Sequence, residues 1–293
     1  MLRLLMAGLL GVVSAGCSVR EPDPAAATQT LPAVRANGAL VTSTQRPAAT
    51  PAASSTPEPA RPTATPTVDP DLVLPDLQTL PPIDLVIEID PATGRKLLRL
   101  TNSIANGGPG ALEVLGALDT TTGKIVVTQH VFLRDGSFEE YATGEFVFHP
   151  GHNHWHIENF TKYEVWSLRS SGVFDAVVAF TGKVSYCLRD NSRYGAVDAP
   201  ARARYSQCER GIQGISPGWI DTYAFDTDGQ IVDITGVPDG VYALRSTVDP
   251  ADQLREADDT NNAATVYFEL KGNRARVIES DDALNRLLQL GDQ

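Results

Sequence analysis

Between residue 70 and about residue 270, apolar and polar residues alternate in short segments that are rich in β-branched side chains. Because successive side chains of an extended chain point to opposite faces, this alternation predicts strands with one buried face. Turn-forming pairs such as Asp239-Gly240 separate the segments. Strands are predicted at residues 83–89, 96–100, 124–132, 145–148, 162–168, 174–180, 231–234, 241–248 and 264–270. The pattern predicts an all-β fold, an antiparallel β-sandwich with long loops.

Only the C-terminal tail has a helical pattern. Ser280 can cap a helix there, and Leu284, Leu287 and Leu288 fall on one face of it. We therefore expect a short helix after the sandwich.

The first 17 residues have the pattern of an export signal. Arg3 is followed by an apolar run at residues 4–13, and small residues precede Cys17. The run is too short to span a bilayer. It resembles a bacterial lipoprotein signal, in which Cys17 would be lipidated, although Ser14 stands where that pattern usually has Leu. We expect an extracytoplasmic protein, either anchored in the membrane through Cys17 or secreted.

Residues 18–70 consist mainly of Pro, Ala, Thr and Ser. With almost no large apolar side chain to bury, such a segment cannot offset the entropy cost of ordering, so a disordered linker is predicted. The folded domain is expected at residues 71–293.

The charge balance excludes one class of partner. The chain has 24 Lys and Arg against 36 Asp and Glu, a net charge of −12, and no basic stripe. We therefore expect no binding to nucleic acid, because such binding needs a basic protein surface that neutralises the phosphates. A negative surface instead favours the approach of cationic small molecules or basic polypeptides.

Four of the five histidines lie within residues 149–156. On a strand, His152, His154 and His156 would share one face and converge at one point. Neutral imidazoles suit copper and zinc, and a site with three histidines leaves coordination positions open, as catalytic sites do. The alternative is a set of surface histidines without a metal.

The other two histidines have different predicted roles. His149 lies outside the alternation and is expected to hydrogen-bond near the site. His130 is expected to be an ordinary histidine with satisfied hydrogen bonds.

The sequence resembles the lysyl oxidase family. The histidine spacing is similar to that family's copper motif. Residues 182–190, Gly-Lys-Val-Ser-Tyr-Cys-Leu-Arg-Asp, resemble its lysine segment, and residues 213–223, Gln-Gly-Ile-Ser-Pro-Gly-Trp-Ile-Asp-Thr-Tyr, resemble its cofactor tyrosine segment. Val-Asp-Ile-Thr at residues 232–235 and Glu-Ala-Asp-Asp-Thr-Asn-Asn at residues 256–262 follow in order. Several ordered blocks with compatible spacings make this resemblance specific.

The resemblance implies an activity and a cofactor. It implies copper on His152, His154 and His156, and a lysine tyrosylquinone formed between Lys183 and Tyr223. The implied reaction is the oxidative deamination of primary amines, either small amines or lysyl side chains of a polypeptide, by molecular oxygen. Its products are an aldehyde, hydrogen peroxide and ammonia.

The residues on either side of Tyr223 depart in part from the family pattern. Asp221 is a candidate catalytic base because it is close in sequence to Tyr223. Trp219-Ile220 and Ala224-Phe225 differ from what the family leads us to expect there, which leaves substrate specificity open.

The three cysteines fit an oxidising compartment. If Cys17 is lipidated, Cys187 and Cys208 remain as a pair that can form a disulfide. It would close a loop of about twenty residues and contribute about 3 kcal/mol in the chain-entropy model.

A second metal site is predicted near the end of the domain. Glu256, Asp258, Asn261 and Asn262 supply the oxygen ligands that calcium prefers. The family resemblance extends to residues 74–77 and would add the Asp76 carboxylate and the Leu77 carbonyl. The alternative is a polar turn. For Asp226-Thr-Asp228-Gly229, a hairpin turn is expected in preference to a calcium loop.

Two other functions remain open. A zinc hydrolase could use the same three histidines to activate water, but it would leave the lysine and tyrosine segments unexplained. A noncatalytic cell-surface module that binds copper or calcium is consistent with the long tether.

Overall fold

A computed structural model describes residues 70–195 and 199–291. All of them belong to one compact unit, Thr63–Gln293. The predicted export signal, the lipidation at Cys17 and nearly all of the predicted linker lie outside the described residues. Within the described residues, no helix is long and apolar enough to cross a membrane.

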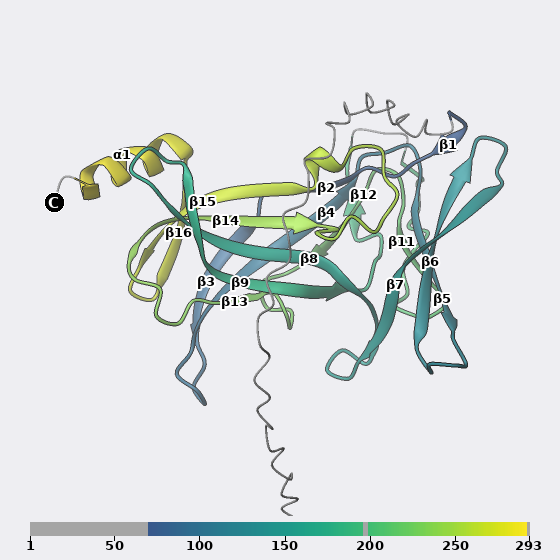
Figure 1. Cartoon of the computed structure of the whole chain (residues 1–293), viewed down its shortest axis with the longest axis horizontal. Helices are drawn as coiled ribbons and strands as arrows, with labels where there is room; N and C mark the ends of the chain where they lie inside the picture. The colour runs from purple at the N-terminus through teal and green to yellow at the C-terminus, as the bar shows by residue number, and fades with distance from the viewer. Residues whose placement is uncertain (1–69, 196–198, 292–293) are drawn as a thin grey trace, which may run out of the picture. The chain divides into compact units, whose positions relative to one another are not determined.

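The described chain forms two antiparallel sheets (Figure 1). The path of the larger sheet is β11 (Ile212–Ile215), β5 (Leu112–Leu118), β6 (Ile125–Leu133), β7 (Phe138–His149), β8 (His154–Leu168), β14 (Gly240–Val248), β15 (Ala263–Lys271) and β16 (Arg274–Ile278). Off this path, β1 (Leu72–Val73) pairs with β6, and β9 (Phe174–Tyr186) pairs with β8. The smaller sheet is β10 (Ser192–Arg193), β12 (Trp219–Tyr223), β4 (Lys96–Asn106) and β13 (Ile231–Asp233), with β2 (Leu77–Thr79) and β3 (Ile83–Ile89) also on β4.

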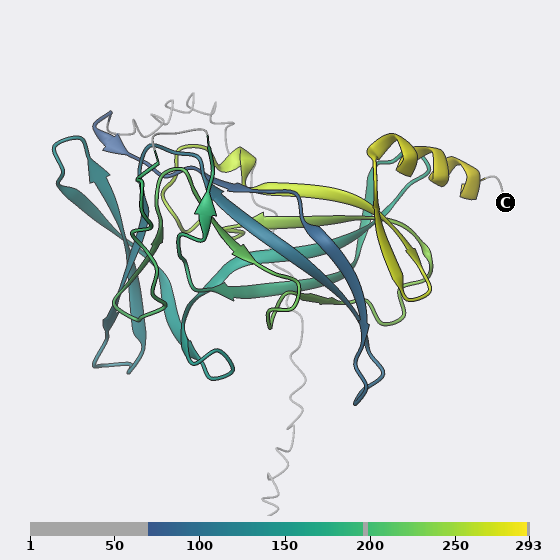
Figure 2. The same cartoon turned by 180° about the vertical axis from the view of Figure 1, so that it is seen from behind.

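The two sheets pack face to face around one apolar core. From behind, β3 and β4 cross in front of β8, β9, β14 and β15 (Figure 2). Fully buried side chains from both sheets share the core, for example Leu98 and Leu100 of β4, Val165 of β8 and Leu244 of β14. This arrangement confirms the predicted all-β sandwich.

Strand β8 positions the site. It pairs with β7 at its beginning and then with β9 and β14 on its two sides. Its 15 residues therefore link the histidine segment to the centre of the sandwich. A strand that is paired on both edges holds its side chains in fixed directions.

The turn after Tyr223 differs from the prediction. Strands β12 and β13 do not form a hairpin, because both pair antiparallel with β4 along the same edge. Residues 224–230 therefore form a loop between two strands on the same edge of β4, and the Asp228-Gly229 turn lies in this loop.

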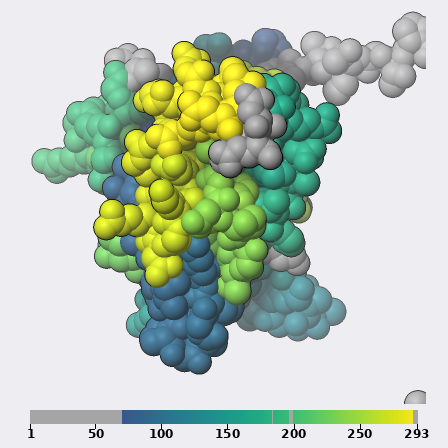
Figure 3. Space-filling view, turned by 90° about the vertical axis from the view of Figure 1, so that its left-hand side faces the viewer, coloured from purple at the N-terminus to yellow at the C-terminus, as the bar shows by residue number. Residues whose placement is uncertain are grey.

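The C-terminal helix forms where it was predicted. Helix α1 (Ser280–Gly291) buries Ala283 and Leu287 against Val241 and Ile278. Leu284 and Leu288, which were expected to share one face with Leu287, are exposed. Figure 3 shows the C-terminal residues above the β3–β4 hairpin, and β16 contacts β3 on this face.

Candidate metal and cofactor site

The histidine segment forms a turn between two strands. Strand β7 ends at His149 and β8 begins at His154. The His152 amide donates to the His149 carbonyl at 3.1 Å, and Asn153 adopts a φ of 56°, which Asn tolerates better than most residues. The prediction that His152 lies on the same strand as the other two was therefore wrong. The Pro150-Gly151 turn brings it over them instead.

The three histidines still converge. One ring nitrogen from each of His152, His154 and His156 can be chosen so that all three lie within 4.8 Å of one another. Nδ1 of His152 is 3.3 Å from Nε2 of His156, and Nδ1 of His156 is 3.1 Å from the Ser185 hydroxyl. Ser185 thus orients the buried imidazole from β9, as partners of metal-binding histidines commonly do.

Burial keeps these imidazoles neutral. It lowers the pKa of His156 to about 3, and the neighbouring histidines act in the same direction. Burial also lowers the pKa of His152 and of His154. Neutral imidazoles have the lone pair that a metal ion needs, so this cluster is chemically suited to a borderline metal such as copper or zinc.

His149 lies directly beside the cluster. It is the cross-strand partner of His154, and its ring stacks on His156 with the centroids 5.0 Å apart. Its Nδ1 is buried and has no hydrogen-bond partner among the described residues. It can therefore support the cluster, and its exact role remains a prediction.

His130 belongs to a separate network. Its Nδ1 lies 3.0 Å from Glu113 Oε1, and its ring stacks on Phe138. This confirms that His130 is a satisfied structural histidine.

Tyr223 lies beside the histidine cluster at the end of β12. Its ring centroid is 6.3 Å from that of His156, nearly perpendicular to it, and 4.0 Å from that of Tyr186. Its hydroxyl accepts a hydrogen bond from the Cys187 amide at 2.7 Å. Burial, followed by nearby Asp221, raises the pKa of Tyr223 above its usual range. The phenol is therefore held neutral and in one orientation.

Lys183 lies in β9, but its side chain is outside the described part of the structure. The same segment reaches the site through Ser185 and Cys187. The pairing of Lys183 with Tyr223 therefore remains a prediction.

Asp221 lies two residues before Tyr223 and is fully buried. Its Oδ2 has no hydrogen-bond partner among the described residues. Burial raises its pKa well above the usual range, and the guanidinium of Arg189 opposes this only in part. A protonated carboxyl is a poor proton acceptor, so this geometry does not favour Asp221 as the catalytic base.

Two cavities meet at the site. The inner cavity has a volume of about 290 Å³ and is lined by His152, His154, Arg189, Cys208, Thr222, Tyr223 and Thr227. The outer cavity, of about 680 Å³, shares His154, Arg189 and Cys208 with it. A small molecule in the inner cavity would therefore lie beside both the histidines and Tyr223.

Two charged residues of the site were not found from the sequence. Asp228, in the loop after Tyr223, has a carboxylate oxygen 3.8 Å from Nε2 of His152. Arg189 lines both cavities. Both residues lie near predicted site residues in the sequence, Asp228 near Tyr223 and Arg189 near Cys187. The sequence did not indicate in which direction their side chains point.

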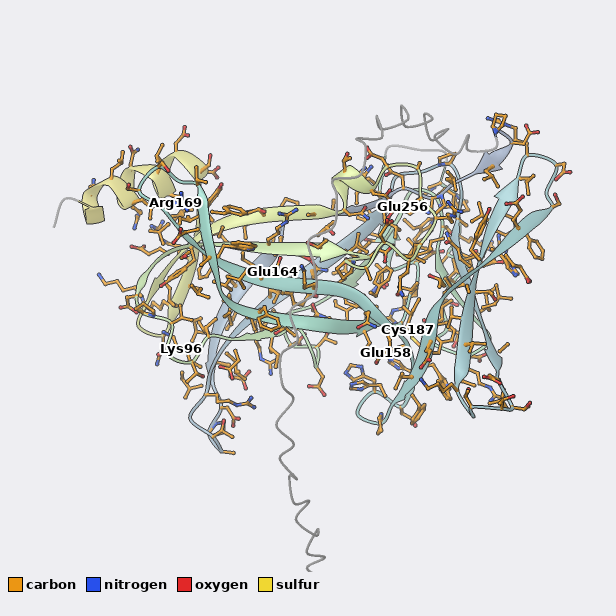
Figure 4. All side chains as sticks on the ribbon, viewed as in Figure 1. Lys96, Glu158, Glu164, Arg169, Cys187 and Glu256 are labelled. Atoms are coloured by element: carbon orange, nitrogen blue, oxygen red, sulfur yellow. A yellow bond between two sulfur atoms is a disulfide. The ribbon has the colours of Figure 1, made fainter. Side chains whose placement is uncertain are left out.

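The predicted disulfide is present. Cys187 and Cys208 are bonded, with their Cα atoms 5.3 Å apart. The Cys208 carbonyl also accepts from the Trp155 amide. The bond therefore joins the segment that contacts Tyr223 to the loop beside β8 (Cys187 is labelled in Figure 4).

Replacing both Cys187 and Cys208 by Ser should lower the free energy of unfolding by about 3 kcal/mol, because the crosslink spans 21 residues and restricts the unfolded chain. Urea unfolding of this variant, compared with the wild type under oxidising conditions, measures the change. A reductant should destabilise the wild type and leave the double variant unaffected. Equal midpoints for both proteins would contradict the prediction.

A second polar cluster joins the beginning and the end of the domain. Oε2 of Glu256 accepts from the Leu77 amide at 2.8 Å, and Asn261 Nδ2 donates to Asp76 Oδ1 at 2.8 Å. Asn262 Nδ2 donates to Glu256 Oε1 at 2.6 Å. The amide oxygens of Asn261 and Asn262 are buried without partners among the described residues. Unsatisfied oxygens beside carboxylates suit a hard cation.

Asp258 is placed differently from the rest of that cluster. It caps the 3₁₀ turn η1 (Asp259–Asn261) by accepting from the amide and hydroxyl of Thr260. Burial raises the pKa of Glu256 to about 7, although hydrogen bonds from Asn262 and Leu77 oppose the rise. A bound cation would favour the charged form of this carboxylate.

Comparison with known proteins shows the family. Residues 136–280, which contain the histidine cluster, β9 and Tyr223, match the Lysyl oxidase family. This part of the chain belongs to the lysyl oxidase family. The sequence resemblance is therefore confirmed for this part of the chain.

Several animal lysyl oxidase homologues show the extent of the similarity. The chain is 36% identical to lysyl oxidase homolog 3A of Danio rerio over 129 residues, and 35% identical to lysyl oxidase homolog 4 of Mus musculus over the same length. These alignments cover 44% of this chain and 16% of each relative. Lysyl oxidase homolog 2 of Homo sapiens is 29% identical over 189 residues, 64% of this chain and 20% of that protein. The chain thus spans at most about a fifth of these relatives.

Proposed function

We propose that this protein is a copper-dependent amine oxidase with a lysine tyrosylquinone cofactor. Copper would bind His152, His154 and His156, and the quinone would form from Tyr223 and Lys183. The observation that supports this most directly is the shared inner cavity, into which His152, His154 and Tyr223 all open. Membership of the lysyl oxidase family supports the same function.

The histidine cluster meets the chemical requirements for copper. Its rings are neutral because of burial, and nitrogen atoms of all three lie within 4.8 Å of one another. Cysteine, the soft ligand that structural zinc sites favour, is absent from this cluster. The cavity leaves space beside the histidines for oxygen or substrate.

When present, copper and the quinone would supply the oxidation of a primary amine to an aldehyde, with release of hydrogen peroxide and ammonia. The protein contributes positioning. The Cys187 amide holds the oxygen of Tyr223, and the ring of Tyr186 packs against its ring with the centroids 4.0 Å apart. The Ser185 hydroxyl holds His156, so that the histidine and the tyrosine keep a constant separation.

The function is tested by adding primary amines to the copper-loaded protein and measuring hydrogen peroxide. Mass spectrometry of a digest should also detect a crosslinked peptide that joins the Lys183 and Tyr223 segments. Peroxide release together with the crosslink is the expected result. Copper binding with neither would favour a noncatalytic metal-binding module.

A zinc hydrolase is the second candidate because Asp228 provides a carboxylate 3.8 Å from His152. That carboxylate is 70% exposed, so solvent weakens its action as a base. Hydrolysis of ester or amide substrates by the zinc-loaded protein, without oxygen consumption, would select this alternative.

We also propose a calcium site formed by Glu256, Asn261, Asn262, Asp76 and the Leu77 carbonyl, with Asp258 beside it. The buried and unpaired amide oxygens of Asn261 and Asn262 support it. By joining β2 to the segment before β15, the ion would fasten the two ends of the domain.

Chelation of calcium should lower the melting temperature of the protein, and added calcium should restore it. Glu256→Gln should remove most of this response, since it removes the buried charge that faces the cation. Scanning calorimetry with and without calcium measures both effects, and copper content serves as the control because it should not change. A melting curve indifferent to calcium would leave only a polar turn.

We propose that the protein works outside the cytoplasm, either secreted or in contact with the membrane only through a lipid on Cys17. The disulfide supports an oxidising compartment. The proposed co-substrates are molecular oxygen and primary amines, either small amines or lysine-rich polypeptides.

A further inference from the structure

Arg189 lies where the two cavities of the proposed active site adjoin. It lines the inner cavity with His152, His154 and Tyr223, and it also lines the outer cavity. Its positive charge also acts on the buried carboxyl of Asp221. A substrate that extends from one cavity into the other therefore lies beside Arg189.

The Arg189 guanidinium acts on Asp221 electrostatically, but no hydrogen bond or ion pair holds it in the described part of the chain. It makes no side-chain hydrogen bond, no ion pair within 4.0 Å and no aromatic stacking contact there. By contrast, Arg99, Arg169 and Arg204 are all paired with carboxylates. The five donors of Arg189 are thus available to a ligand.

The backbone around Arg189 is held firmly. Cys187 is fixed by the disulfide, and the Leu188 amide donates to Gln213 Oε1 at 3.0 Å. The carboxylate of Asp190 accepts from the amides of Arg204 and Ser216 at 2.8 Å. Because the backbone is already fixed, ligand binding by Arg189 would have to order only its side chain.

Arginines outnumber carboxylates in the linings of the two cavities. Arg189 acts electrostatically on the buried carboxyl of Asp221, and burial favours the neutral form of that carboxyl. The outer cavity adds one more arginine, Arg210, and one carboxylate, Glu209, neither of which is in an ion pair with a described residue. The protein as a whole is acidic and attracts amines from a distance, but the two cavity linings carry two arginines against one carboxylate, and the Asp228 carboxylate lies beside His152.

We propose that Arg189 selects primary amines that also carry a carboxylate. This inference rests on the proposed amine oxidation. The planar guanidinium matches a carboxylate with two parallel hydrogen bonds. The amine end of such a molecule would lie in the inner cavity beside Tyr223. A second positive charge on the substrate would instead be repelled by Arg189. Arg189 is thus a specificity-determining residue, and the substrate class is an amino acid with a terminal amine or a lysine beside an acidic residue.

Three six-carbon amines test the inference. They are 6-aminohexanoate, hexylamine and 1,6-diaminohexane, which differ in the charge at the far end. For the copper-loaded full chain, we expect kcat/KM to be about tenfold higher for 6-aminohexanoate than for hexylamine, and lowest for the diamine. Arg189→Gln should remove this preference, and Arg189→Lys should retain part of it. Equal values in the wild type, or a preference that survives Arg189→Gln, would overturn the proposal.

A binding measurement separates this inference from the proposed oxidation. In copper-loaded Tyr223→Phe, which cannot form the quinone, calorimetric titration should show that Arg189→Gln weakens binding of 6-aminohexanoate about tenfold and leaves hexylamine unchanged. This result is independent of turnover. If no amine is oxidised, the proposed function fails, and the titration still decides whether Arg189 recognises the carboxylate.

Arg169→Gln is the matched control. Arg169 pairs with Asp175 at the turn between β8 and β9, and Figure 4 labels it at the far end of these strands from Cys187. This variant changes the net charge as Arg189→Gln does, so it should leave the order of the three amines unchanged. A similar loss of preference in Arg169→Gln would assign the effect to overall charge and overturn the proposal.

Discussion

His154→Ala is expected to lose almost all copper and, with it, the quinone. His154 lies on β8, and its ring is within reach of both His152 and His156. Removing one of three nitrogen ligands leaves two. This should weaken copper binding by at least a hundredfold, because mutating even a hydrogen-bond partner of a metal ligand lowers metal affinity by about 10–100-fold. Elemental analysis and quinone absorbance of the purified variant measure the loss.

Asn153→Gly is the control for this variant. Asn153 lies next to His154 in the chain, and Gly tolerates its φ of 56°. Copper and absorbance should therefore stay at wild-type levels. If His154→Ala retained full copper, the cluster would not be the metal site and the proposed function would fail.

Tyr223→Phe and Lys183→Ala should each abolish amine-dependent peroxide release while copper stays bound. Both residues are required to form the proposed cofactor, but neither belongs to the histidine cluster. Tyr223→Phe also leaves the buried Cys187 amide without its acceptor, which should cost about 1–3 kcal/mol of stability. Peroxide assays, copper analysis and thermal unfolding distinguish the two effects.

The matched control is Tyr242→Phe. Tyr242 is a buried tyrosine in β14 whose hydroxyl donates to the Pro238 carbonyl, remote in sequence from the histidines. Peroxide release should persist in this variant. Unchanged turnover in either Tyr223→Phe or Lys183→Ala would rule out the quinone mechanism.

Apolar segments rich in β-branched residues predicted several of the strands. The expected segment at residues 83–89 coincides with β3, and the segment at 241–248 lies within β14. Strand β5 was missed because Leu-Gly-Ala-Leu at residues 115–118 does not alternate and because Glu113, although charged, is buried. Strand β12 was missed because it is short and contains the buried Asp221. Such polar groups are stabilised by contacts distant in sequence, which a local pattern does not contain.

The site was predictable where the chemistry depends on residue type and spacing. The histidine cluster, Cys187, Cys208 and Tyr223 were all named from the sequence. The structure places His152, His154, Cys208 and Tyr223 around one cavity, with His156 and Cys187 in contact with them. The position of His152 was wrong because the Pro150-Gly151 turn ends the strand pattern. Asp228 and Arg189 could not be placed, because their direction depends on how β12 and the segment after β9 pack.

Cys187 performs two tasks through different atoms: its sulfur is bonded to Cys208, and its amide holds the oxygen of Tyr223. The redox potential of the compartment therefore acts on Cys187, the residue that orients Tyr223. In a reducing cytoplasm the loop carrying Cys208 would be released, and the wall of the cavity would be incomplete. Under the proposed function, the enzyme would mature only after export, so the cell that makes it would not be exposed to its own hydrogen peroxide during synthesis.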